Sequence, residues 1–325
     1  YGSYLQKQVR ELEKLRTEQQ TILEHMSPST AECVRRAAAV DRELWGRLSH
    51  DDDFLSLRVG SGTLSASFSL QAPKQVLQLE SDTLAEQPSQ IAERFSTVPD
   101  CPICVSLGDH LSCGVVGKRA RCVGLGRNLI VQAATHHSYC DLRIVVLCEQ
   151  DETAQWEFCR WLPHCWDETH SARLIANTPE TIRRLLARLE PVFSVRAAAG
   201  ENAAFGVAPR TKPWYLFVCA TPETVAQHTF MKYLTANRRE LGLSVVYLFD
   251  RIDMLPEECH DILDCSEATG MLFERRHASQ KQLFLPDRVQ DEQYEQFARS
   301  LAPLRMEVKG APTLPRSISF LHGYN

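Results

Sequence analysis

The sequence predicts an α/β fold in which a mainly parallel sheet is covered by helices on both faces. From residue 103 onward, short apolar segments alternate with longer amphipathic ones, which is the pattern of βαβ units. The segments 142–149 and 243–250 are apolar almost throughout, as expected of strands buried on both sides. A chain of 325 residues, 44% hydrophobic and 24% charged, is long enough to bury such a sheet.

The first 50 residues are expected to form a helical arm. Apolar residues recur at steps of three, four and seven through Leu5, Val9, Leu12, Leu15 and Ile22. The tetrapeptide "SPST" at 27–30 ends this helix and offers an N-cap for a second one. Two interpretations stay open: a stalk that leads from an upstream membrane anchor, or an ordinary N-terminal helical hairpin.

Residues 51–100 are expected to hold a β-hairpin and a connecting segment. Apolar and polar residues alternate over 53–70 around "GSG", which favours a hairpin turn at those glycines. A polar stretch with one short helix, 88–98, follows.

Residues 101–307 carry the main domain. Strands are expected at 103–107, 111–117, 142–149, 172–176, 214–220, 243–250, 270–275 and 281–286. Helices are expected at 119–137, 178–193, 221–241 and 291–304, with a Gly/Ala-rich loop at 197–210. The aromatic segment 156–166 is expected to pack in the core, with a protein-docking surface as the alternative. The Pro/Gly-punctuated end, 308–325, is expected to be a linker to a following domain.

The segment "CGVVGKRARCVGLG" joins a strand to a helix, where nucleotide-binding folds hold phosphate. Aligned with G-x-x-x-x-G-K-[ST] from Gly114, it has Ala120 at the Lys position and Arg121 at the Ser/Thr position. Gly114 and Gly117 are candidates for the turn, and Lys118, Arg119 and Arg121 for weak anion or nucleotide binding. A purely structural turn is the competing interpretation.

A Walker-B strand ends in an acid that holds Mg²⁺. The strand "WYLFVC" instead runs into Cys219 and Ala220. Asp250 ends the next strand and is a candidate metal-holding acid, with an ion pair near Arg251 as the alternative. Loss of the Lys, the Ser/Thr and the acid together indicates a nucleotide-hydrolase fold without hydrolytic groups, so no catalytic residue is assigned.

Metal binding is not expected. "CPIC" at 101–104 is followed by Cys113, Cys122 and "HHSYC" at 136–140, but these do not form the two tight pairs of a structural zinc site. The twelve cysteines mostly stand in apolar contexts and are expected to be buried free thiols in a reducing compartment. A zinc-bound interaction domain using Cys101 and Cys104 stays a weaker alternative.

Charge and hydropathy exclude two classes of partner. A net charge of −5 and a pI near 6.1 give no basic field for nucleic acid or acidic lipid. The apolar runs are far shorter than the roughly 20 residues of a bilayer span, and the N-terminus lacks the apolar core of a signal peptide. Because the chain starts with Tyr1 in a helical pattern, we expect a piece of a longer protein.

The order of these segments resembles the EssC/EccC proteins, the membrane-anchored FtsK/SpoIIIE-type ATPases of type VII secretion. The resemblance rests on "DDDFLSLRVGSGTL", "CGVVGKRA", "DLRIVVL", "WEFCRWLPH" and "LSVVYLFDRIDMLPEEC", with the end "LPRSISFLHGYN" similar to the linker before the first conventional ATPase domain. It implies a membrane-proximal, degenerate ATPase-like domain on the cytoplasmic side, with three P-loop domains expected after it.

The resemblance further implies that the full protein is an ATPase that assembles as a ring and exports small helical-hairpin proteins. For this chain we expect a structural and coupling role, a monomer in isolation, and no cofactor beyond weakly bound ATP and Mg²⁺. An atypical ATPase that uses Lys118 or Arg121 in place of the P-loop Lys, with Asp250 at the metal, is the alternative. The expected partners are the following ATPase domains, other membrane components of the secretion system and further copies of the chain.

Overall fold

A computed structural model describes residues 2–68, 83–202 and 211–306. The helices are α1 Gly2–Met26, α2 Thr30–Ala39, α3 Thr83–Arg94, α4 Arg119–His136, α5 Thr153–Trp156, α6 Pro179–Asn202, α7 Pro222–Ala226, α8 Met231–Leu234 and α9 Asp291–Leu301. The strands are β1 Ser56–Ser65, β2 Thr97–Ser106, β3 Ser112–Gly117, β4 Leu142–Leu147, β5 Ile175–Ala176, β6 Trp214–Cys219, β7 Leu243–Phe249, β8 Asp261–Cys265, β9 Gly270–Glu274 and β10 Gln282–Pro286. Short 3₁₀ segments include η1 Gln150–Glu152 and η2 Glu157–Trp161.

The ten strands form one sheet in the order β2-β1-β10-β9-β8-β3-β7-β6-β4-β5. The six strands from β8 to β5 run parallel, and β9, β10, β1 and β2 continue the sheet antiparallel. The predicted α/β class with a mainly parallel core sheet is confirmed. Since β1 pairs with β10 as well as with β2, strands β1 and β2 extend the same sheet.

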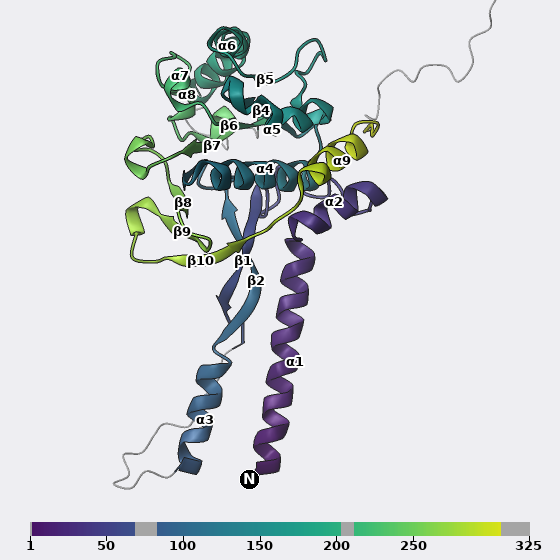
Figure 1. The fold of residues 1–325 in the computed structure, drawn as a ribbon, viewed down its shortest axis with the longest axis vertical. Helices are drawn as coiled ribbons and strands as arrows, with labels where there is room; N and C mark the ends of the chain where they lie inside the picture. Colours follow the sequence, from purple (N-terminus) through teal and green to yellow (C-terminus); the bar gives the residue numbers. More distant parts are fainter. Residues whose placement is uncertain (1, 69–82, 203–210, 307–325) are drawn as a thin grey trace, which may run out of the picture.

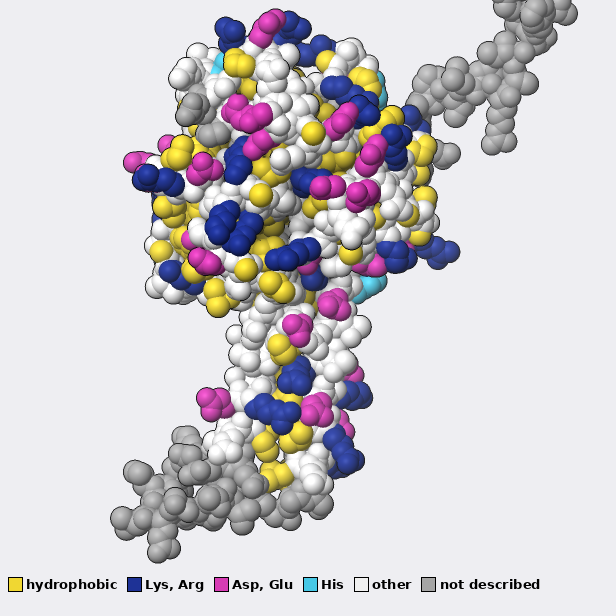
Figure 2. Space-filling view, viewed as in Figure 1, with side chains coloured by type: hydrophobic (Ala, Val, Ile, Leu, Met, Phe, Trp, Pro, Cys, Tyr) yellow, Lys and Arg dark blue, Asp and Glu magenta, His cyan; other side chains and the backbone are white. Residues whose placement is uncertain are grey.

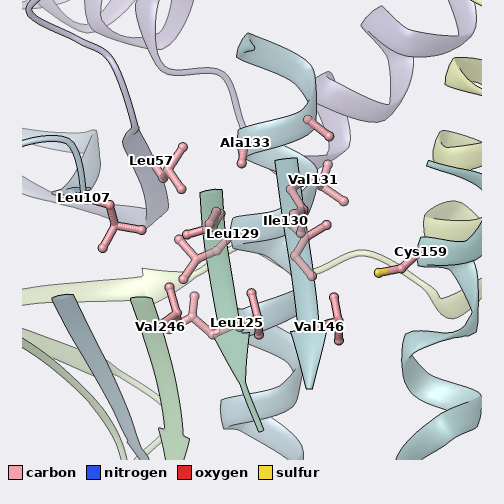
Figure 3. Packing of buried hydrophobic residues seen from close by; sticks show 14 of the residues in the cluster. Leu57, Leu107, Leu125, Leu129, Ile130, Val131, Ala133, Val146, Cys159 and Val246 are labelled. Carbon is pink, nitrogen blue, oxygen red and sulfur yellow. The ribbon is translucent and has the colours of Figure 1, made fainter. Parts of the chain in front are cut away.

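Each face of the sheet has its own apolar core, because successive side chains of a strand point to opposite faces. On β4, Ile144 and Val146 pack toward α4, whereas Val145 and Leu147 pack toward α6. Helices α2, α4 and α9 cover the first face and α6, α7 and α8 cover the second. Figure 3 shows the first core, where Leu125 and Leu129 of α4 face the sheet.

An arm projects from this domain. Helix α1, about 37 Å long at 1.5 Å per residue, extends away from the sheet beside β1, β2 and α3 (Figure 1). Side-chain bonds attach it to the strands: Gln20 Nε2 donates to Pro99 O at 2.7 Å, and Gln19 Oε1 accepts from Ser67 N at 2.9 Å. The first of the two predicted helices therefore forms the arm, whereas the second, α2, packs against α4 and α9 of the domain.

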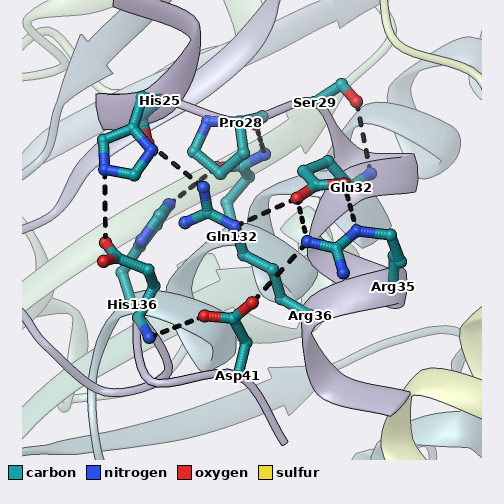
Figure 4. A network of polar contacts seen from close by, with 10 residues as sticks. His25, Pro28, Ser29, Glu32, Arg35, Arg36, Asp41, Gln132 and His136 are labelled. Carbon is teal, nitrogen blue, oxygen red and sulfur yellow. Dashed lines mark hydrogen bonds and ion pairs between the residues drawn. The ribbon is translucent and has the colours of Figure 1, made fainter. Parts of the chain in front are cut away.

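The joint between the arm and the domain is polar and partly buried (Figure 4). Gln132 of α4 donates to Pro28 O at 2.8 Å in the α1–α2 turn, and Arg36 of α2 donates to His25 O at 3.3 Å. Ser29 caps α2 as predicted, because its Oγ accepts from Glu32 N at 3.2 Å. The base of α1 is thus bonded to two helices of the domain.

The hairpin predicted over 53–70 is wrong. Strand β1 continues through Gly60 and Gly62, and its antiparallel partner β2 comes after α3 in the sequence. The glycines are needed because β10 approaches closely: a Cβ on Gly60 would lie 2.1 Å from Leu285 O, and one on Gly62 would lie 2.4 Å from Leu283 O. Glycine here marks close backbone approach rather than reversal.

Two further details differ from expectation. The helix predicted over 221–241 is broken into α7, α8 and a 3₁₀ turn, since Asn237 adopts a positive φ of 46° and Phe230 is drawn into an aromatic cluster around Phe193. Strand β8 was not predicted, because its sequence "DILDC" is short and carries two acids. Helix α6 continues through part of the expected loop 197–210, whose positions 203–210 lie outside the described residues, as does the tail 308–325.

The aromatic segment 156–166 forms short helical turns against α9. Trp156 and Phe158 are buried, which agrees with core packing. None of the described helices combines the length and apolar composition of a membrane span. On the face drawn in Figure 2, basic and acidic side chains are interspersed over the domain and the arm.

Candidate functional site

The junction of β3 and α4 is shorter than a phosphate-binding loop. Strand β3 ends at Gly117 and α4 begins at Arg119, so Lys118 alone connects them. Gly117 makes the turn, with φ of 122° and the backbone of Ser266 so close that a Cβ would lie 2.5 Å from its nitrogen. Gly114 does not contribute to the turn: it lies inside β3, where a Cβ would lie 2.4 Å from Leu255 Cδ1.

The amino end of α4 still has the electrostatics that favour an anion. Its first turn carries no acidic side chain, and Lys118 at the N-cap position is exposed and makes no side-chain cap. The helix dipole places partial positive charge at this end. What decides the chemistry is where the neighbouring arginines point.

Arg119 points along the carboxyl edge of the sheet and is bound there. Its Nη2 lies 2.6 Å from Glu152 Oε2, its Nε contacts the other carboxylate oxygen, and its Nη1 donates to Leu248 O at 2.9 Å. Nη2 also donates to Ala220 O. One side chain thereby joins α4 to η1 and to the ends of β6 and β7.

Electrostatics stabilise the charge on Arg119. Burial opposes that charge, but the hydrogen bonds and negative charge of Glu152 outweigh it and raise the pKa of the guanidinium. Glu152 is itself largely buried, with 12% of its side chain exposed. In open α/β sheets, ligands bind outside the carboxyl ends of the strands, and here the Arg119–Glu152 pair fills that position.

Arg121 is also occupied by the protein. Its Nη1 donates to Ser266 O at 2.7 Å and to Cys265 O at 3.3 Å, directly after β8. The two arginines predicted to attract an anion therefore satisfy carbonyls and a carboxylate on either side of the β3–α4 turn.

The strand compared with a Walker-B strand is β6, and β7 lies between it and β3. Cys219 ends β6 with its side chain fully buried, and burial raises the pKa of its thiol to about 12. Ala220 follows with its carbonyl on Arg119. A carboxylate is therefore absent from the position where this strand would present one to Mg²⁺.

Asp250 follows β7 and is exposed. It lies close enough to Arg119 for its negative charge to favour the guanidinium. The alternative ion pair with Arg251 is not formed, because Arg251 pairs with Asp253 at 2.6 Å. Asp250 thus stands at the same edge as Arg119 but on its solvent side.

A cavity of about 250 Å³ opens near the ends of β6 and β7. Its lining is apolar apart from backbone groups and one tyrosine: Cys219, Val225, Ala226, Met231, Tyr247, Phe249, Met254, Leu255 and Pro256. Such a lining suits no phosphate, because it offers no cation to neutralise the charge.

The "CPIC" cysteines do not converge on a metal site. Cys101 and Cys104 lie on β2 three residues apart, so their side chains point to opposite faces. In the described part of the chain they join no cluster of potential metal ligands. His136 and His137 are core residues: burial lowers the pKa of His137 to about 3, and its Nε2 accepts from Leu55 N at 3.1 Å.

Comparison with known proteins supports the resemblance to EccC/EssC proteins. A protein named ESX secretion system protein EccC from Geobacillus thermodenitrificans is 27% identical over 323 residues, 99% of this chain and 22% of that protein. Type VII secretion system protein EssC of Staphylococcus aureus is 25% identical over 331 residues, which cover 100% of this chain and 22% of the EssC protein. The chain resembles type VII secretion proteins of the EccC/EssC type along its whole length.

Solved structures of EccC/EssC proteins agree on the fold. The cytoplasmic domain of the Thermomonospora curvata type VII secretion ATPase EccC covers 86% of this chain with a TM-score of 0.53 at 12% identity, over 33% of its own length. EssC (ATPases 2 and 3) from Geobacillus thermodenitrificans covers 86% with a TM-score of 0.51 at 10% identity, over 55% of its own length. No protein-family model matches the chain, and the chain spans about a fifth of the length of its EccC/EssC relatives.

Sequence reasoning missed one residue of this edge, Glu152. Its signal is weak: it belongs to the acidic run 149–152 that directly follows buried strand β4. Because the carboxyl ends of parallel strands share one edge, an acid there is within reach of a cation at the start of α4.

Proposed function

We propose that this chain is a non-catalytic, ATPase-like structural and coupling module of a type VII secretion motor. The observation that carries the proposal is the position of Arg119, whose guanidinium binds Glu152, Leu248 O and Ala220 O at the edge where a nucleotide would need to lie. The names of the relatives support the assignment to secretion, and the absence of a P-loop Lys supports the lack of hydrolysis.

The chemistry of this edge disfavours nucleotide in two ways. A phosphate would have to displace the carboxylate of Glu152 from a two-point contact, and charge-assisted contacts of this kind are among the strongest hydrogen bonds. A phosphate beside Glu152 would also place like charges together at low exposure. The β3–α4 turn, one residue long, offers too few backbone amides to enclose a phosphate.

In this role the arm and the domain act together. The arm would lead from a membrane anchor, and the end of the chain would lead to the first conventional ATPase domain, on the cytoplasmic side. Ring assembly, other membrane components as partners and export of small helical-hairpin proteins belong to the same proposal. It rests on the arm described above and on the relatives, which extend well beyond this chain.

Calorimetric titration with Mg-ATP, run beside a phosphate-release assay, tests the proposal. The wild-type chain is expected to show neither binding nor release. Glu152→Gln removes the acidic competitor while keeping the shape of the side chain, so binding that appears only in this variant would support occlusion by the ion pair. Saturable binding and release by the wild-type chain would overturn the proposal.

An atypical ATPase is the second candidate, because Asp250 is exposed at the end of β7 close to Arg119. It requires Mg²⁺-dependent phosphate release that Asp250→Asn reduces strongly. Asp253→Asn is the matched control, since Asp253 is an exposed aspartate of the same loop whose partner is Arg251. Equal release by the wild-type chain and both variants would dismiss this candidate.

A further inference from the structure

Two histidines and an aspartate meet at the opposite edge of the sheet from Arg119. His110 Nδ1 lies 2.7 Å from Asp261 Oδ2, and His260 Nδ1 lies 3.0 Å from Asp261 Oδ1. The two imidazole rings stack with centroids 4.0 Å apart. Asp261 is nearly buried, whereas about a third of each histidine side chain is exposed. One nitrogen of each ring and a carboxylate oxygen thus converge at the surface.

The three residues come from segments far apart in the sequence. His110 belongs to the β2–β3 connection, and His260 directly precedes and Asp261 begins β8, which is the parallel neighbour of β3. Ser112 fixes their relative position, because its Oγ accepts from His260 N at 3.1 Å and donates to Glu258 O at 3.2 Å. His260 O in turn accepts from Arg275 N at 2.8 Å. The backbone that carries the cluster is therefore held from several sides.

The donor set is that of a transition-metal site. Imidazole nitrogen and carboxylate oxygen are ordinary ligands of Zn²⁺, and two histidines with one carboxylate leave a coordination position open. Tetrahedral ligands about 2.0–2.1 Å from zinc lie about 3.3 Å from one another. The ligand atoms of the three residues all lie within 4.8 Å of one another, and because the nitrogen–oxygen separations of 2.7 and 3.0 Å are shorter than this spacing, the side chains must move apart to admit an ion.

A cleft adjoins the cluster. It has a volume of about 380 Å³, and His110 and Asp261 line it together with Glu274 and His277 from the next strand and its 3₁₀ turn. Glu274 lies opposite Asp261 in the β8–β9 ladder, and its Oε2 is 2.9 Å from His277 Nδ1. An open coordination position facing this cleft would be accessible to water and close to the polar side chains of Glu274 and His277.

We propose that His110, His260 and Asp261 bind a divalent transition-metal ion of the Zn²⁺ type, with the remaining position directed to the cleft. The ion joins the β2–β3 connection to the start of β8. The site is independent of the proposed function at the carboxyl edge, and it uses none of the cysteines in "CPIC". In the competing arrangement Asp261 accepts two N–H bonds from the imidazoles and binds no ion.

The test uses the 325-residue chain without a histidine tag, stripped with chelator and titrated with Co²⁺ and Zn²⁺. The expected result is one Co²⁺ per chain with visible ligand-field absorption, displaced by Zn²⁺, and an increase in the melting temperature with ion concentration. His260→Ala and His110→Ala are each expected to weaken binding at least tenfold. Asp261→Asn, which keeps the shape but not the charge, is expected to do the same.

His50→Ala is the matched control, because His50 is an exposed histidine whose Nε2 lies 3.6 Å from the carboxylate of Asp51. It is expected to leave Co²⁺ binding unchanged. Circular dichroism of each metal-free variant checks that the fold is kept, and the conservative His260→Gln replaces any variant that fails to fold. Absence of saturable binding by the wild-type chain, or equal binding by wild type and both histidine variants, would overturn the site.

Discussion

Arg119 and Glu152 form a two-point ion pair, with Nη2 2.6 Å from Oε2, across the carboxyl edge of the parallel sheet. The pair spans 33 residues of sequence and joins the start of α4 to the turn after β4. Through the carbonyls of Leu248 and Ala220 the same guanidinium also holds the ends of two central strands. Its removal is therefore felt by four elements at once.

Arg119→Met is expected to lower the free energy of unfolding by about 2 to 4 kcal/mol, because it leaves a largely buried carboxylate and two carbonyls without their partner. Urea unfolding measures the change. Arg251→Met is the control: its pair with Asp253 is exposed to solvent, and its loss is expected to change the free energy of unfolding much less than Arg119→Met does. Equal losses of unfolding free energy in both variants would mean that the Arg119–Glu152 pair contributes no more to stability than an exposed ion pair.

Gly117→Ala is expected to destabilise the chain by about 2 kcal/mol or more, since φ is 122° and the new Cβ would lie 2.5 Å from Ser266 N. Gly124→Ala, seven residues later in α4, is the counterpart. Nothing lies within 4 Å of its new Cβ, so alanine is expected to stabilise the helix by about 0.5–1 kcal/mol. The melting temperatures of the two variants should shift in opposite directions relative to the wild-type chain. A shift in the same direction would contradict the geometry of the turn.

Stability is expected to fall as the solution is acidified from pH 7 to pH 5. Burial lowers the pKa of His137 to about 3 and of His164 to about 4, below the value near 6.5 of an unfolded chain. The unfolded chain therefore binds more protons in this range, and each histidine removes roughly 1.4 kcal/mol per pH unit below pH 6.5. Urea unfolding at both pH values measures the loss. His164→Gln should reduce the pH dependence of the free energy of unfolding, and His50→Gln should not. The same pH dependence in the wild-type chain and both variants would contradict the assignment to the buried histidines.

Alkylation is expected to separate the cysteines by burial. Cys140 is exposed, whereas Cys33, Cys113 and Cys219 are buried, and burial raises the pKa of their thiols. Because the thiolate is the nucleophile, iodoacetamide should label Cys140 first in the folded chain and the other three only after unfolding. Peptide mass spectrometry gives the order. Early labelling of Cys219 in folded protein would show that the end of β6 opens to solvent.

The central sheet was readable from the sequence because its strands are buried on both faces. Segments such as 142–149 and 243–250 are apolar almost throughout, which leaves little doubt about their assignment as buried strands. Strand β8 escaped because five residues with two acids carry no such signal. Residues 261–265 form a strand because they pair with β3, and this pairing exists only in the folded chain.

Glycine and charge were harder to interpret. Gly60, Gly62 and Gly114 looked like turn residues, but each lies within a strand where another segment passes too close for a side chain. The arginines after Gly117 were identified as candidates, but their partners Glu152 and Ser266 lie 33 and 145 residues away. A sequence shows which side chains carry charge, whereas the fold decides whether that charge is already neutralised.

Strand β1 belongs to two parts of the molecule. Near Gly60 it pairs with β10 inside the domain, and near Ser65 it pairs with β2 alongside the outgoing helix α1. The β1–β2 ladder therefore runs from one part into the other, with register shifts between Arg58 and Gly60 and between Gly62 and Leu64. A force that tilts the arm must either turn the edge of the sheet with it or break backbone hydrogen bonds, so the arm behaves as a lever fixed to the sheet rather than as a tether.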